Sequence, residues 1–279
     1  MSIDRSNTIL QYNQSFVVNG YQLSGVDNVQ INHSSPLENA LVLGTDFGFN
    51  LNSPFTAEIS MDRSLLYVDP MLSFTGDSSF SGSFLYNGQN YAFTSGFLNR
   101  YSIDCSVGDI PRISCSIAVY GELKQINDAV TLQSHPAIYI PSPRSISVSG
   151  DHTDTNRVKS FTYEMSISRQ PVYSLDSAKN VDDVIFIPPI NISASLVIDA
   201  YDFTPDDYKD FLYSTEAKTF NVNIKDRASN TQMLNLNIPN IQLVGQNLTA
   251  TSENSLTITN NYLGYIRWVY FTTGIEILN

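Results

Sequence analysis

The segment Tyr101–Gly121, YSIDCSVGDIPRISCSIAVYG, constrains the fold more than any other part of the chain. Large side chains alternate with small or polar ones on both sides of a turn at Gly108–Arg112. A period of two residues puts alternate side chains on one face, which is typical of half-buried antiparallel strands. The segment therefore predicts a β-hairpin. Counting outward from the turn predicts that Cys105 and Cys115 face each other on its inward side.

The composition agrees with an all-β protein. The chain has 279 residues, enough for one large or two ordinary domains, and 42% of them are hydrophobic and 11% aromatic, so a real core can form. Abundant Tyr, Phe, Ser, Thr and Asn favour strands and turns, whereas scarce Ala, Lys and Glu argue against a helical protein. The N-terminus lacks an apolar signal core and no stretch is long enough to span a bilayer, so we expect a chain that first folds in a cytoplasm.

Short-range patterns predict further strands. Asn19-Gly20 and Asn87-Gly88, each between apolar runs, are strong signals for two-residue hairpin turns. Alternation predicts strands at Val26–Asn32, Pro54–Met61, Val158–Arg169, Ile185–Asp199 (one bent strand or a pair), Phe220–Lys225 and Met233–Ile238.

The remaining segments predict loops and little helix. Leu37–Phe49 and Gln170–Val184 are expected to be long loops at corresponding positions of the two halves. Asp62–Pro70 fits a short helix or an irregular crossing. Thr204–Leu212 is the best helix start, because Thr204 suits the N-cap, a proline follows it, and two aspartates complement the helix dipole.

A proline-rich stretch divides the chain. Pro136, Pro141 and Pro143 disfavour a central strand and favour an extended connection. We therefore predict a first β domain over residues 1–135, a linker over 136–157 and a second β domain over 158–279.

The two halves show the same order of features at an offset of about 135 to 145 residues, which predicts a tandem duplication. The matched segments are Val29–Pro36 with Tyr163–Pro171, Ser53–Ile59 with Pro188–Ala194, and the facing pairs Cys105/Cys115 and Val107/Ile113 with Leu248/Ile258 and Ala250/Leu256.

The sequence offers little that could carry chemistry. His33, His135 and His152 lack metal-ligand spacing, and there is no nucleophile elbow or phosphate-binding loop. We therefore predict no catalytic, cofactor-binding or metal-binding residue, and no enzyme.

Four weaker patterns have structural explanations. The oxygen-rich loop at Asp151, Asp154 and Asn156 fits either a calcium site or, more simply, a solvated loop. Neighbouring residues of a strand point to opposite faces, so Asp182-Asp183 makes a poor acid–base pair, and helix capping explains Asp206-Asp207. The glycosylation-like sequences at Asn191 and Asn247 are read as strand residues. The cysteines could form a disulfide, but two reduced core thiols are the simpler interpretation.

The formal net charge of −12 opposes a nucleic-acid-binding surface, because phosphate contacts need clustered Lys and Arg. Only 15% of the residues are charged, so the acidity reflects missing bases more than acidic runs.

Three segments carry a resemblance to a known family. They are SFVVNGYQLSGVDNVQ (Ser15–Gln30), the hairpin YSIDCSVGDIPRISCSIAVYGEL, and VKSFTYEMSISRQPVYSLDS (Val158–Ser177). Over most of residues 15–260 the chain resembles the tail tube proteins of tailed bacteriophages. The resemblance implies two tandem β-sandwich or β-barrel domains, each with a short flanking helix, that pack side by side in rings and line a channel with their inner strands.

The resemblance also implies partners. A tandem chain would form a trimeric ring with pseudo-sixfold symmetry, with Pro36–Asp46 and Gln170–Val184 as loops between subunits. Such rings stack in the tail of a virion assembled in a bacterial cytoplasm, where they contact tail, neck and baseplate proteins and have no membrane anchor. An acidic lumen would let DNA pass without binding. The alternative function is a tandem β-sandwich adhesin that recognises a cell-surface carbohydrate.

Overall fold

The computed structural model describes residues 16–34, 37–40, 48–51, 56–76, 78–86, 89–121, 123–126, 139–150, 158–174, 181–199, 218–250 and 256–266. Within these residues the protein is almost entirely β-strand, which confirms the predicted all-β class. The described part also contains one short 3-10 helix, η3 (Met71–Phe74).

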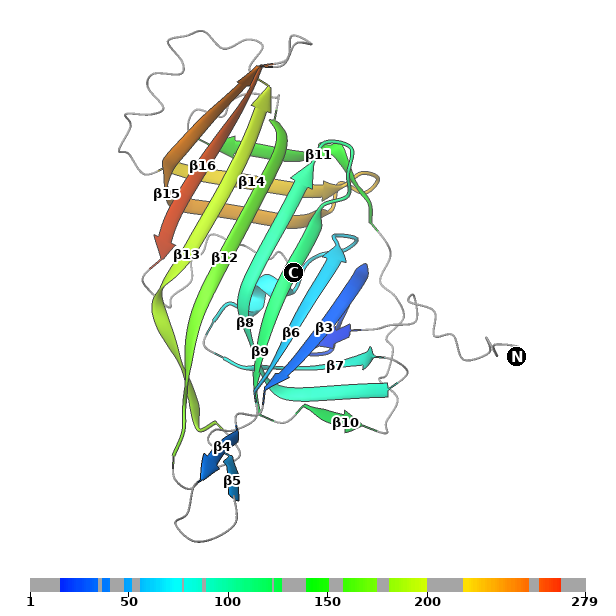
Figure 1. Ribbon diagram of the computed structural model, residues 1–279. Coiled ribbons are helices and arrows are strands. Elements are labelled where there is room, and N and C mark those ends of the chain that lie inside the picture. The colour runs from blue at the N-terminus through cyan, green and yellow to red at the C-terminus, as the bar shows by residue number, and fades with distance from the viewer. Residues whose placement is uncertain are drawn as a thin grey trace, which may run out of the picture.

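Eight antiparallel strands form one continuous sheet across the front of the molecule (Figure 1). Their order from edge to edge is β3 (Val26–Ser34), β6 (Thr56–Ser64), β9 (Arg112–Tyr120), β8 (Gln89–Ser106), β12 (Val158–Val172), β13 (Asp183–Asp199), β16 (Leu256–Ile266) and β15 (Gln232–Ala250).

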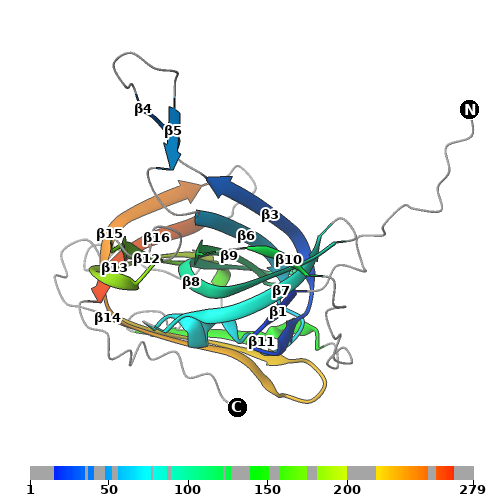
Figure 2. The ribbon, with the colours of Figure 1, turned by 90° about the horizontal axis from the view of Figure 1, so that it is seen from below.

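Two long strands leave this sheet and build a second layer behind it (Figure 2). The first part of β8 pairs with β7 (Phe80–Tyr86) and β10 (Lys124–Ile126). On its other side β7 pairs with β1 (Phe16–Val18), which pairs with β2 (Tyr21–Leu23). The first part of β15 pairs with β14 (Lys218–Asp226), which pairs with β11 (Pro141–Gly150). The buried apolar residues belong to these front and back strands, so the core lies between the two layers.

The topology contains the same unit twice. Each half contributes four strands to the front sheet. The fourth in spatial order, β8 in the first half and β15 in the second, bends into the back layer, where it pairs antiparallel with β7 or β14. The irregularities of the ladders also coincide: β3 and β12 shift register after Val26 and Val158, and β8 and β15 shift after Leu98 and Leu243. Bulges at matching places in matching strands support the predicted duplication.

These bulges fix which residues correspond. Val29 corresponds to Phe161, and Ile103 corresponds to Leu248. The match of Val29 with Tyr163 that the sequence predicts lies two residues beyond the structural counterpart, Phe161. A two-residue slip keeps every side chain on its face, so alternation alone cannot detect the error.

The hairpin around residue 110 forms as predicted, but its register differs. Tyr101 faces Cys115, and the β8–β9 ladder ends at Asp104 and Arg112. Cys105 lies beyond the end of that ladder, and on the other edge of β8 it pairs with Phe161 of β12. The prediction that Cys105 and Cys115 face each other is therefore wrong. Both are buried free thiols, which confirms the reduced alternative.

The Asn19-Gly20 turn is confirmed. Val18 pairs with Tyr21, and both turn residues have positive φ, 46° and 83°, as a type I′ hairpin turn requires. Tyr86 likewise pairs with Gln89 on either side of Asn87-Gly88.

Several predicted loops contain strands. The stretch Leu37–Phe49 includes most of a hairpin formed by β4 (Leu37–Ala40) and β5 (Gly48–Leu51). In Gln170–Val184, Gln170, Pro171 and Val172 continue β12 and pair with β13. The predicted linker contains β11, which joins the second half through β14.

Some predictions lie outside the described residues. They are the helix at Thr204–Leu212 with Asp206-Asp207, the loop with Asp151, Asp154 and Asn156, and the histidines His135 and His152. In the first half, the segment between β6 and β7 is an irregular crossing followed by η3.

Candidate functional site: the open edges and the concave face of the sheet

The two halves meet at an internal joint, defined here as the pairing of β8 with β12. Its core-facing pairs are Cys105 with Phe161, Ile103 with Tyr163 and Tyr101 with Met165, and all six side chains are buried. On the other face the Arg100 guanidinium lies 2.8 Å from the Glu164 carboxylate. The joint is therefore an ordinary interior sheet contact, closed by apolar packing on one side.

The two ends of the sheet have no such closure among the described residues. β3 pairs only with β6, and the second part of β15 pairs only with β16. Leu248 of β15 is 51% exposed, whereas its counterpart Ile103 is 1% exposed. Val29 and Ile31 of β3 are partly exposed, whereas their counterparts Phe161 and Tyr163 are buried. The edges thus carry core-type side chains without the strand that would cover them.

A second difference lies at the base of the joint. In the first half, the aromatic side chains of Phe97 and Tyr120 pack against each other, and the Arg169 guanidinium lies 5.1 Å from the Phe97 ring centroid. Arg169 also donates to the carbonyl oxygen of Gly76 at 2.7 Å. Arg169 of β12 thereby covers this aromatic pair of the first half.

The corresponding surface of the second half is open. Leu263 and Tyr265 occupy the positions of Ala118 and Tyr120, and they are 40% and 61% exposed. Val244, at the β15 bulge beside them, is also exposed. We call Val244, Leu263 and Tyr265 the apolar patch.

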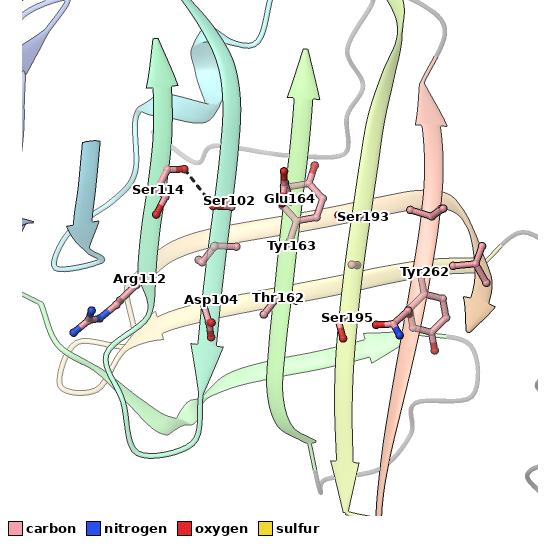
Figure 3. Close-up of a pocket in the computed structure, with 15 residues that line it drawn as sticks. Ser102, Asp104, Arg112, Ser114, Thr162, Tyr163, Glu164, Ser193, Ser195 and Tyr262 are labelled. Carbon is pink, nitrogen blue, oxygen red and sulfur yellow. Dashed lines mark hydrogen bonds between the residues drawn. The ribbon is translucent and has the colours of Figure 1, made fainter. Parts of the chain in front are cut away.

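The front face of the sheet is polar and concave. Figure 2 shows the edge strands β3 and β15 lying forward of the central strands. A hollow of about 490 Å³ lies on this face, and the side chains drawn over it in Figure 3 are mostly hydroxyl-bearing or acidic. They include Ser102, Asp104, Thr162, Glu164, Ser193 and Ser195.

Among the described residues, the carboxylates of this face outnumber its cations. The carboxylates are Asp27, Glu58, Asp62, Asp104, Glu164 and Asp199, and the cations are Arg100, Arg112 and Lys159. Hydroxyl groups satisfy several of the carboxylates: Ser114 donates to Asp62 at 2.6 Å and Ser116 to Glu58 at 2.7 Å. The face therefore combines fixed polar groups with a net negative charge.

The described candidate residues lie on different strands. In the part of the chain that the structure describes, no group of three or more His, Cys, Asp or Glu residues could hold a metal ion. Asp183 begins β13, and Asp182 directly precedes it. Asn191 in β13 and Asn247 in β15 are strand residues, as predicted. His33 lies exposed on the edge strand β3.

The thiols are not poised for reaction. Burial, with a smaller effect from the charge of Asp104, raises the pKa of Cys105 to about 12. Burial likewise raises the pKa of Cys115. Both side chains therefore stay protonated and act as apolar core residues.

Sequence reasoning missed the open edges. Alternation showed which side chains point inward, but strand order decides which strand remains uncovered. The one available signal was the duplication, because a joint inside a duplicated chain implies a matching pair of free ends.

No helix of the described residues is long and apolar enough to cross a membrane. No family model matches the sequence. No curated protein matches it either.

Proposed function

We propose that this protein is a structural subunit that assembles into rings by pairing β15 of one copy with β3 of the next. The observation that carries the proposal is the contrast between the closed internal joint and the two open ends, which carry the corresponding strands. Edge strands with unpaired backbone groups are templates for strand addition.

The internal joint supplies the register of the contact between copies. Ile103 pairs with Tyr163 and Ser102 with Glu164, so the counterparts place Leu248 opposite Ile31 and Asn247 opposite Asn32. The apolar pair then falls on the core side and the amide pair on the polar face. At these two pairs both faces of the sheet continue across the contact.

The same correspondence gives the apolar patch an occupant. In the internal joint Arg169, near the end of β12, lies over the ring of Phe97, which packs against Tyr120. β4 follows β3 at the place in the repeat that the end of β12 occupies, so we infer that the β4–β5 hairpin of the neighbouring copy reaches Val244, Leu263 and Tyr265. Covering this patch adds apolar burial to the backbone pairing.

A head-to-tail contact of this kind closes into a ring when its rotation closes. Each chain contributes two similar four-strand units, so a ring of three chains, as the resemblance implies, has pseudo-sixfold symmetry. The concave polar face lines its channel. A lining with excess carboxylates repels duplex DNA over about 8 Å at physiological salt, which suits passage without binding.

These features support a phage tail tube protein, whose rings stack in the virion tail and contact neck and baseplate proteins. Assembly then takes place in the host cytoplasm. The open edges of the sheet support assembly through strand pairing, and the resemblance of the sequence supports its assignment to a phage tail.

Cysteine cross-linking tests the register. In a variant with Asn32→Cys and Asn247→Cys the two thiols lie at opposite ends of the sheet of one chain, so oxidation can join them only between copies. We expect covalent oligomers up to a closed ring on a non-reducing gel. The matched control, Asn32→Cys with Leu248→Cys, places the thiols on opposite faces and should cross-link far less.

Negative-stain microscopy of the oxidised and unmodified proteins should show rings or hollow tubes. A protein that stays monomeric at high concentration, with equal cross-linking in both variants, would refute the proposal. If such monomers bind glycans on an array, the hydroxyl-lined hollow of Figure 3 is better explained as the binding surface of an adhesin.

A further inference from the structure

We propose that the base of each joint selects its partner strand, with Arg169 as the selecting residue inside the chain and Leu37 as the selecting residue between copies. This inference rests on the proposed assembly through β3 and β15, and it names the residues that keep the two joints from exchanging partners. Such an exchange would pair β3 of one copy with β8 of another, because β8 and β15 occupy the same place in the repeat.

The β4–β5 hairpin and the end of the β12–β13 ladder are counterparts, pair by pair. The spacing between matching residues of the front strands, continued along each strand, carries the whole β4–β5 ladder onto the β12–β13 ladder. The four matched pairs are Leu37–Leu51 with Arg169–Phe186, Glu38–Asn50 with Gln170–Ile185, Asn39–Phe49 with Pro171–Val184, and Ala40–Gly48 with Val172–Asp183. Because each strand is matched on its own, the agreement of all four pairs identifies the hairpin as the counterpart. Leu37 therefore holds the register position of Arg169.

Inside the chain, Arg169 covers the front of the first half at the base of the joint. Its guanidinium lies 5.1 Å from the ring centroid of Phe97 and donates to the carbonyl oxygen of Gly76 at 2.7 Å. Phe97 pairs with Ala118, and these two residues are 6% and 9% exposed. An aromatic face with carbonyl acceptors beside it is a favourable site for a guanidinium. We call the Phe97–Ala118 pair the floor of the internal joint.

The floor of the open joint differs at both positions. Gln242 pairs with Leu263 there, in the places that Phe97 and Ala118 hold in the first half. The aromatic ring is thus replaced by an amide, and the larger apolar side chain lies on the other strand. Leu263 is 40% exposed, whereas Ala118 is 9% exposed. An apolar residue such as Leu37 can cover this floor without taking a charge out of water.

The cation and the ring beneath it therefore occur together inside the chain, and both are replaced in the open joint. Pairing of β3 with β8 would put Leu37 over Phe97 and give up the guanidinium contacts. Pairing of β12 with β15 would put Arg169 over Gln242, without the ring that Phe97 supplies. Specificity is a difference between affinities, so each of these losses favours the correct pairing.

A double-mutant cycle on the full chain tests the selection, with the dissociation constant of the contact measured by sedimentation equilibrium at pH 8. Leu37→Arg removes an apolar group from the contact and should raise this constant at least about fivefold. Gln242→Phe in the Leu37→Arg background rebuilds the pair of the internal joint and should lower it again about fivefold. Gln242→Phe alone should lower it by less, because Leu37 brings no cation to the new ring.

The matched control is Asn50→Arg, which adds the same charge to the same hairpin. Its counterpart Ile185 is 51% exposed in the chain, so this position does not face the floor. Asn50→Arg should therefore change the dissociation constant by less than about twofold. Circular dichroism of each variant checks that the fold is retained.

The outcomes separate the selection from the assembly. If Leu37→Arg assembles like the wild type, or if Gln242→Phe helps both backgrounds equally, the selecting role is refuted, and the assembly stands as long as the Asn32→Cys/Asn247→Cys cross-link forms. An equal loss in Asn50→Arg also refutes it, because charge alone then explains the effect. If the chain without these substitutions shows neither assembly nor the specific cross-link, the proposed function fails as well.

Discussion

Truncation of two corresponding side chains, Ile103→Ala and Leu248→Ala, should have opposite consequences for folding and assembly. Both residues occupy the same place in the repeat, on the core side of the bent strand. Ile103 lies against Tyr163 in the internal joint, whereas Leu248 lies at the open edge.

The exposed fractions set the magnitudes. Ile103 is 1% exposed, so its truncation should lower the free energy of unfolding by about 2–5 kcal/mol. Leu248 is 51% exposed, so folding buries only half of it, and its truncation should cost about 1 kcal/mol of the roughly 2 kcal/mol that full burial provides. Assembly buries the other half, so Leu248→Ala should weaken each contact by about 1 kcal/mol, or about fivefold.

Urea unfolding followed by circular dichroism measures the first effect, and sedimentation equilibrium at pH 8 measures the second. Leu248→Ala should assemble less at a stability close to that of the wild type. Ile103→Ala should unfold much earlier, with its remaining folded fraction still able to assemble. If Leu248→Ala assembles like the wild type, β15 is not an assembly edge and the correspondence between the two joints has no functional meaning.

Two further predictions concern the core of the first half. Asp69 pairs with the buried Arg63 and accepts a hydrogen bond from the Tyr101 hydroxyl at 2.6 Å, so Asp69→Asn should lower the free energy of unfolding, measured in urea, by about 3–5 kcal/mol. The control Asp62→Asn, on the exposed face, should change it by less than about 1 kcal/mol. A small loss of stability in Asp69→Asn would contradict a structural role for the Arg63–Asp69 pair. Burial raises the pKa of the Cys105 thiol from an ordinary value of 9 to about 12. The unfolded chain therefore releases this proton between pH 9 and 12 while the folded chain keeps it, so thiol reagents should not label the folded protein at pH 8, and Cys105→Ala should reduce the loss of stability above pH 9. Labelling at the rate of an exposed thiol would refute this assignment.

The sequence determined the class of the fold and the position of most strands. Alternation located β6, β12 and the β8–β9 hairpin, and the Asn-Gly pairs located the tight turns. These signals are local, because the two-residue period and the φ angles of the turn depend on neighbouring residues alone.

Register and strand order depend on distant partners, so they could not be predicted in the same way. Cys105 misses Cys115 because the β8–β9 ladder begins at Asp104 and Arg112, so Cys115 faces Tyr101, four residues from the predicted partner. A shift by an even number of residues keeps every side chain on its face, so alternation cannot detect it. The candidate site suffered the same limit. Leu248 and Ile103 have similar sequence surroundings, and only the topology shows that one is covered and the other is not.

The distribution of protection among the sheet edges argues that β3 and β15 are used. Soluble proteins shield free edges with very short strands, prolines or lysines. In the back layer, the edge strands β2 and β10 have three residues each, and the edge strand β11 contains Pro141 and Pro143, so these edges are shielded. The front sheet differs. β3 has no proline or lysine, and neither does the part of β15 that pairs with β16.

The chemistry of the two joints adds to this argument. The internal joint carries the Arg100–Glu164 ion pair, whereas the counterparts at the open edges are Gly245 and Asn32. An ion pair within one chain forms whenever that chain folds. A charged side chain on a free edge would instead lose its hydration at every association step, which costs free energy, and it would favour pairing with the wrong edge. The neutral pair Gly245 and Asn32 at this position leaves the match between β3 and β15 to select the partner. Edges that are unshielded and complementary are expected of a chain whose native state includes its neighbours.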